Sequence, residues 1–371
     1  AINWLHNQQA AAPEKPFFIY YAPGSAHAPH QAPADWIARF RGQFDEGWDQ
    51  LREEILARQK TMGIVPGEAD MAARPEQIPA WDSLSADQKK VYARYMEVFA
   101  AMLAFQDAQF GRLLDEIQRM GLADNTLVVF IEGDNGASGE GGPGGTLNEL
   151  AHLSSADGEH EVDIQWLADN LDILGGPDTY QGFPVGWAYA TSTPFPWVKQ
   201  IASHLGGVRN GLVVAWPQRI PARGQIREQY HHVIDIMPTL LEAAQVKAPV
   251  EVDGIGQQPI DGASMVYSFG EAEAASPRRT QYYEINGNRG VYHDGWLAST
   301  TPRNMPWDIA KAGAGSDTSS YPWELYDLRS DFSQAHNLAA GEPERLRELR
   351  AVFDAEARRN NVYPIQNLSL I

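Results

Sequence analysis

Short apolar runs along the chain predict buried β-strands. Residues 127–131 form an unbroken run of β-favouring side chains, and residues 17–21 and 211–217 show the same pattern. Strands that are covered on both faces read as continuous apolar runs, so these three segments are expected in the interior of a sheet.

Helical patterns lie between and after these runs. Residues 85–121 begin with a capping box from Ser85 to Gln88 and keep apolar residues at helical spacing until Gly121. Residues 232–244 predict a second helix. Its expected inward positions are Val233, Ile236, Met237, Leu240 and Leu241. The alternation of strands with helices predicts an α/β fold with a mostly parallel sheet flanked by helices.

The pattern changes after about residue 270. Short apolar runs separated by Asn-Gly and Asp-Gly turns predict an antiparallel sheet, a further strand follows at residues 323–328, and residues 343–359 predict an amphipathic helix. We therefore predict two domains. Residues 1–270 form the larger α/β unit, and residues 271–371 form a smaller α+β subdomain of antiparallel sheet plus helix.

Composition excludes several classes of function. The 371 residues carry a net charge of −19 without any cluster of Lys and Arg, so binding to nucleic acid or to an anionic membrane is not expected. No apolar stretch is long enough to predict a membrane segment. The absence of cysteine excludes disulfides and thiolate zinc sites.

Asp134 and Asn135 are the first candidate ligands. They directly follow the strand predicted at residues 127–131. Ligands of open α/β sheets bind at the carboxyl ends of strands, and a carboxylate next to an amide offers the hard oxygens that suit Ca²⁺ or Mg²⁺. The other interpretation is an ordinary Asn-Gly turn.

His27 and Lys199 are the other candidates. His27 lies in a Pro-framed loop after the predicted strand at residues 17–21, and a parallel neighbouring strand would place it at the same sheet edge as Asp134. Lys199 follows an aromatic segment and precedes a Gly pair, which makes it a candidate anion binder. Exposed, solvated side chains are the alternative for both.

Three further patterns predict structure and not function. Residues 139–144 match G-x-G-x-x-G, but Pro143 breaks the turn and no clean helix follows, so dinucleotide binding is not expected. His231 and His232 indicate a helix entry. Residues 286–288 indicate a hairpin turn and nothing more.

Together these motifs resemble the type I sulfatases of the alkaline phosphatase superfamily, and most of all the large bacterial arylsulfatases. The resemblance extends over essentially the whole chain and follows its order. The matching segments are the His27 loop, the Asp134-Asn135 turn, residues 193–199 with the following Gly-Gly-Val-Arg and Trp-Pro, the helix after His232, and residues 288–296 and 324–328.

The resemblance implies an alkaline-phosphatase-like fold and hydrolysis of a small-molecule sulfate ester. It also implies Ca²⁺, in preference to Mg²⁺, held partly by Asp134 and Asn135, and a formylglycine made from cysteine or serine. His27 and Lys199 would bind the substrate and supply a proton or a positive charge to the leaving oxygen.

One part of the family pattern is not in this sequence. There is no cysteine and no Ser-x-Pro-x-Arg, the signature that the family carries upstream of these motifs. We therefore expect the chain to lack the N-terminal part with the formylglycine motif and to be inactive alone. A phosphonate or phosphate ester hydrolase of the same superfamily and a non-catalytic remnant stay as alternatives. Oligomeric state and compartment, periplasmic or cytoplasmic in a bacterium, stay open.

Overall fold

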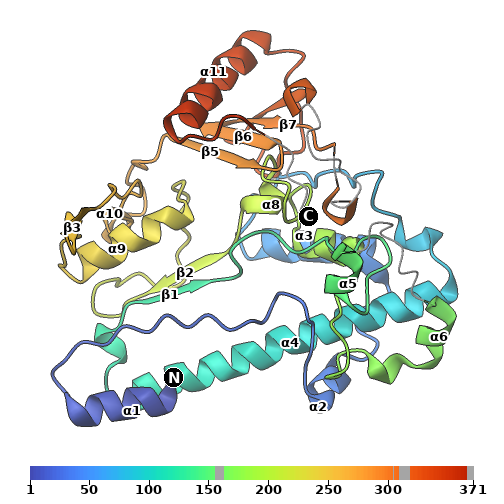
Figure 1. Cartoon of the computed structure of the whole chain (residues 1–371), viewed down its shortest axis with the longest axis horizontal. Helices are drawn as coiled ribbons and strands as arrows, with labels where there is room; N and C mark the ends of the chain where they lie inside the picture. The colour runs from blue at the N-terminus through green and yellow to red at the C-terminus, as the bar shows by residue number, and fades with distance from the viewer. Residues whose placement is uncertain (155–162, 304, 309–317, 366–371) are drawn as a thin grey trace.

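The computed structural model describes residues 1–154, 163–303, 305–308 and 318–365 (Figure 1). A long helix, α4 (Ala86–Arg119), runs along one side of the molecule, and a C-terminal sheet covered by helix α11 (Pro343–Arg359) lies at the opposite side. The strand pair β1 (Val128–Ile131) and β2 (Leu212–Ala215) lies between them in Figure 1.

Helix α4 is the prediction that the structure confirms most closely. Ser85 accepts a hydrogen bond from the Gln88 backbone N–H, and the Gln88 side chain accepts from the Ser85 N–H, so both halves of the capping box form. The helix ends at Arg119, and Gly121 adopts a φ of +73° that stops its continuation.

The main core lies where α4 meets α3 (Gly47–Thr61) and α7 (Val185–Thr191). Trp48 and Trp187 are fully buried and pack edge to face at a centroid separation of 5.5 Å. Gly186 lies so close to Trp48 that an added Cβ would stand 2.4 Å from its ring. A glycine at this position therefore allows the two helices to approach.

The strands predicted at residues 127–131 and 211–217 are present, but they pair with each other in antiparallel register, Val128 opposite Ala215. The strand predicted at residues 17–21 was wrong. Those residues are extended without strand pairing, with Phe18 and Tyr20 exposed and Phe17 and Ile19 packed on the cluster around Leu5. An apolar run forms a strand only where a neighbouring strand completes its hydrogen bonds. All named strands in the described ranges pair antiparallel.

The C-terminal sheet was predicted from its turns and is confirmed. Strands β5 (Thr280–Ile285), β6 (Asn288–His293), β7 (Trp296–Thr300) and β8 (Trp323–Asp327) form it in that order. The Asn286-Gly287 and Asp294-Gly295 pairs have positive φ angles, as two-residue hairpin turns require. One face of the sheet packs on α11 and the other on Phe195 and Leu205. The domain boundary at residue 270 stays a prediction.

Short elements complete the described chain. They are α1 (Ile2–Ala11), α2 (Ala34–Ile37), α5 (Glu149–Ser154), α6 (Ile164–Asp169), α8 (Leu205–Val208), α9 (Ile236–Ala243), α10 (Tyr267–Gly270), β3 (Glu251–Val252) and β4 (Ile255–Gly256). The helix predicted at residues 232–244 is present as a 3-10 turn (Val233–Asp235) followed by α9. The inward positions predicted for Val233 and Met237 were wrong, since both side chains are about half exposed. Asp235 and Thr239 are buried instead, because Arg278 neutralises Asp235 and Thr239 donates to its carbonyl. None of the described helices could span a membrane.

Candidate active site

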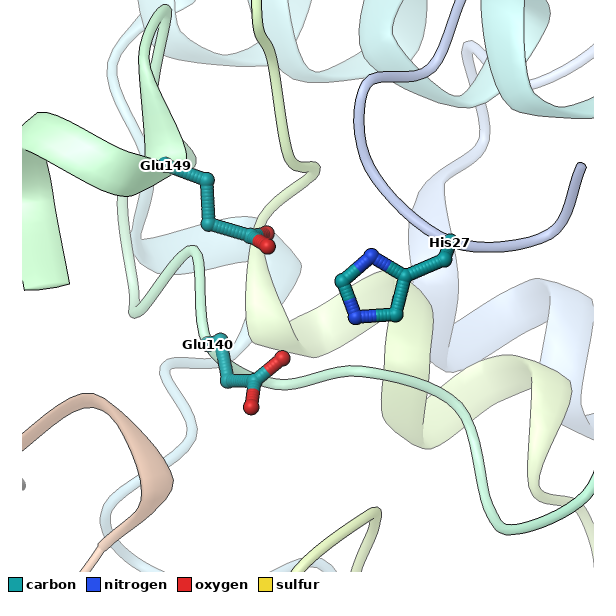
Figure 2. A group of neighbouring side chains, drawn as sticks. All are labelled: His27, Glu140 and Glu149. Carbon is teal, nitrogen blue, oxygen red and sulfur yellow. The ribbon is translucent and has the colours of Figure 1, made fainter. Parts of the chain in front are cut away.

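Three segments far apart in the sequence meet at the predicted histidine and lysine. They are the loop that carries His27, the Gly-rich segment after β1 that carries Glu140, and the segment before α8 that carries Lys199. Glu149, in the first turn of α5, reaches the same place. Figure 2 shows His27, Glu140 and Glu149 pointing toward a common space.

His27 has a defined hydrogen-bonding arrangement. Its Nδ1 lies 3.0 Å from the Ala28 carbonyl oxygen, which can only accept, so Nδ1 carries the proton in this contact. Nε2 is then an acceptor in the neutral ring, and Lys199 Nζ donates to it at 3.0 Å. The structure therefore brings together the two residues that the sequence proposed for the leaving group.

Glu140 binds the other side of the Lys199 ammonium. Its Oε2 accepts from Lys199 Nζ at 2.9 Å and from Ser138 Oγ at 2.7 Å, and its Oε1 accepts from the Gln200 side chain. Burial raises the pKa of the Glu140 carboxyl, but the charge of Lys199 and these hydrogen bonds outweigh burial and hold the pKa below its ordinary value. Glu140 is thus a buried carboxylate with a fixed cationic partner.

Glu149 lies in the same space, but its surroundings shift its pKa in the opposite direction. Its side chain is buried, and burial followed by the negative charge of Glu140 raises its pKa against the opposing effects of His27 and Lys199. One ligand atom each from His27, Glu140 and Glu149 lies within 4.8 Å of the others, a spacing that could hold a metal ion. Lys199 already donates to two of these three groups, so an ion there would have to compete with the ammonium.

His30 supports the site from within the core. It is 2% exposed and packs against the rings of Phe99 and Phe183. Burial, with a smaller contribution from His27, lowers the pKa of His30 to about 3, so this ring is neutral at physiological pH. His30 therefore adds no charge to the site.

Asp134 is exposed and Asn135 is partly buried, and neither belongs to this cluster. The Asn135 amide donates to Asp134 Oδ1 at 2.5 Å, and the Asn135 carbonyl accepts from Asn210 at 2.9 Å. The turn continues to Ala137, whose carbonyl accepts from the Lys199 backbone N–H at 3.0 Å. The oxygen donors suit a hard cation in kind, and two residues supply only a minority of the six to eight ligands of Ca²⁺.

Sequence reasoning missed both glutamates. Glu140 lies inside the segment that matched a dinucleotide motif. Its position only five residues after Asn135, a predicted metal ligand, could have marked it as a candidate site residue. Residues 286–288 form the expected hairpin turn, and the Asn288 side chain also donates to the Gln200 carbonyl at 3.1 Å. His232 does cap the helix entry, as predicted: its Nδ1 accepts from the Ile234 N–H.

Comparison with known proteins follows the same segments. The profile of the Sulfatase family matches residues 1–246. An uncharacterized sulfatase of Schizosaccharomyces pombe is 29% identical over 362 residues, which are 96% of this chain and 60% of that protein. An arylsulfatase of Klebsiella aerogenes is 30% identical over 244 residues, 66% of this chain and 49% of that protein. The chain thus spans about half the length of these relatives.

Solved structures show the same fold. The crystal structure of Ps i-CgsB superposes with a TM-score of 0.54 at 17% identity and covers 96% of this chain and 52% of that one. The structure of the putative sulfatase yidJ from Bacteroides fragilis gives a TM-score of 0.52 at 14% identity and covers 97% of this chain and 57% of that one. The α/β fold is therefore the alkaline-phosphatase-like fold of these sulfatases. With the family profile matched over residues 1–246, the chain belongs to the sulfatase family.

Proposed function

We propose that the whole protein is a hydrolase of small sulfate monoesters, of the arylsulfatase type. Family membership and the similarity to the Klebsiella aerogenes arylsulfatase support the class of reaction. The contact between Lys199 Nζ and His27 Nε2, at 3.0 Å, is the observation that carries the assignment of residues.

In the proposed reaction a nucleophilic oxygen from outside these 371 residues forms a new bond to sulfur, the bond between sulfur and the leaving oxygen breaks, and negative charge develops on the leaving oxygen. The Lys199 ammonium stabilises this charge, and the proton at the Nζ to Nε2 contact is available to the departing alcohol or phenol. Glu140 holds the ammonium on its other side, so Lys199 does not need to reorient during the step.

The proposed reaction also needs a metal ion and a nucleophile, which the described side chains do not supply. A Ca²⁺ ion held partly by Asp134 and Asn135 would neutralise the sulfuryl oxygens, in keeping with their hard oxygen donors. The sequence has neither cysteine nor Ser-x-Pro-x-Arg, so the proposal assigns the formylglycine nucleophile to a segment outside these 371 residues.

The test compares a sulfate ester with the matching phosphate ester, 4-nitrophenyl sulfate and 4-nitrophenyl phosphate, in the full-length protein. We expect faster hydrolysis of the sulfate. Lys199→Ala should lower kcat by about 10²-fold or more, since it removes a fixed charge from the developing anion. Asp134→Ala should weaken Ca²⁺ binding measured by calorimetry and abolish turnover.

Contrary results separate the alternatives. Faster turnover of the phosphate ester would favour the phosphatase reading of the same fold. A full-length protein without any esterase activity would favour the non-catalytic remnant. Unchanged calcium affinity in Asp134→Ala would remove Asp134 from the metal site.

A further inference from the structure

Glu140 is a buried side chain that the proposed reaction does not use directly. It is 6% exposed, and its two carboxylate oxygens accept three hydrogen bonds, from Lys199, Ser138 and Gln200. A carboxylate with this many donors is held in one orientation and has little capacity left for a further partner. Protein groups therefore fix the position of the Glu140 carboxylate.

Lys199 depends on Glu140 for its own position. Its backbone N–H is tied to the Ala137 carbonyl at 3.0 Å, but the long side chain reaches the site through rotatable bonds. Nζ then contacts only Glu140 and His27 among the described residues, at 2.9 and 3.0 Å. Of these two partners only Glu140 can carry a negative charge, so Glu140 supplies the charge opposite to the ammonium.

Three further titratable groups lie near Lys199 and Glu140. They are His27, Glu149 and, behind His27, the neutral His30. Glu149 lies near Glu140, and burial favours its protonated form, whereas Lys199 favours the ionised form of Glu140. Lys199 Nζ forms its ion pair with Glu140, at 2.9 Å, so Glu140 is the carboxylate that faces the ammonium.

We propose that Glu140 is a positioning residue that holds the Lys199 ammonium against His27 and keeps a proton on this pair. The proposal rests on the proposed function, because it assigns Glu140 a role through Lys199 and His27. Glu140 itself does not meet the substrate in this arrangement. Its carboxylate lies 2.9 Å from Lys199 Nζ, so removing the negative charge should leave the ammonium without its ion-pair partner.

The experiment uses Glu140→Gln in the full-length protein, since glutamine keeps the size of the side chain and removes its charge. The first measurement is the rate at which an amine-reactive reagent labels Lys199 at pH 8, followed by mass spectrometry. An adjacent opposite charge shifts a titration by about one unit or more, so labelling should be at least about tenfold faster in the variant. The second measurement is the pH profile of kcat, whose alkaline limb should move to lower pH by about one unit with KM little changed.

Glu116→Gln is the matched control. Glu116 is also a buried carboxylate between a histidine and a cation, with His6 at 2.7 Å and Arg119 as its partners, but it lies on α4 against α1. This variant should leave both Lys199 labelling and the pH profile unchanged. Glu140→Asp, which keeps the charge but draws it back from Lys199 Nζ, should label faster than the wild type and more slowly than Glu140→Gln, and it carries the test if Glu140→Gln does not fold.

Unchanged labelling in every Glu140 variant that folds would overturn the proposal, and so would an equal rise in Glu116→Gln. A uniform loss of kcat at all pH values, with the limb in place, would also overturn it, because that is the result of a merely structural role. Labelling needs no turnover, so failure of the proposed function and failure of this inference give different results.

Discussion

At the scale of single residues, the side chains of His27 and Lys199 contact each other, and each is held by a different partner. The ring of His27 is oriented by the Ala28 carbonyl, while Lys199 is oriented by Glu140. A proton held between two nitrogens can be released to a leaving oxygen without any large movement. The effect of losing His27 should therefore depend on how much the leaving group needs that proton.

His27→Ala should slow hydrolysis of esters with poor leaving groups far more than of those with good ones. General acid catalysis contributes about 10² to 10⁴-fold, so we expect a loss in this range for an alkyl sulfate and a loss below about tenfold for 4-nitrophenyl sulfate. Steady-state kinetics over a series of phenyl sulfates would measure the slope. Equal losses across the series would mean that His27 only positions the substrate.

Sequence reasoning reached His27 and Lys199 but not their carboxylate partners. His27 stands in a Pro-framed loop after a predicted strand, and Lys199 stands between an aromatic segment and a Gly pair. Glu140 and Glu149 become neighbours only because the chain between β1 and α7 folds back, with Glu149 N–H bonded to the Tyr180 carbonyl. Such a juxtaposition depends on the path of irregular segments, which no local pattern encodes.

At the scale of elements, the approach of α7 to α3 leaves no room for a side chain at Gly186. Gly186→Ala should destabilise the protein by about 1–3 kcal/mol, because the new methyl group would overlap the Trp48 ring. Urea denaturation would measure the change. Gly111→Ala is the control: this α4 glycine has nothing within 4 Å of an added Cβ, and the change should stabilise by up to about 1 kcal/mol. Equal effects of the two substitutions would contradict the packing argument.

Elements with strong local signals were predictable, and those that depend on a neighbour were not. The capping box fixed the start of α4, and the Asn-Gly and Asp-Gly turns fixed the C-terminal hairpins. The apolar run at residues 17–21 carried the same signal as β1, but pairing decides between a strand and an extended segment. Likewise the period of α9 was correct, while the side that faces inward is set by the Asp235–Arg278 ion pair.

At the scale of the whole molecule, the β1–β2 pair presents apolar side chains to solvent. Val213 is 61% exposed, and the paired residues Ile131 and Leu212 are each 38% exposed. Each of the two strands pairs only with the other within the described ranges, so their outer edges offer unpaired backbone groups there. Exposed apolar strand edges promote association.

The 371-residue chain expressed by itself should therefore self-associate, and Val213→Lys should reduce this association. Light scattering as a function of concentration would measure it. Val250→Lys is the matched control, since Val250 is 86% exposed but lies outside the pair. A monomeric wild-type chain, or the same reduction with both substitutions, would show that the β1–β2 pair is not the associating surface.

Gln200 connects the C-terminal sheet to the cluster around Lys199. Its side chain donates to Glu140, and its carbonyl accepts from Asn288 at the first residue of β6. A shift of this sheet would thus be transmitted to Glu140 through a single residue. Under the proposed function, substitutions in the C-terminal part of the chain could therefore retune the leaving-group step while His27 and Lys199 stay the same.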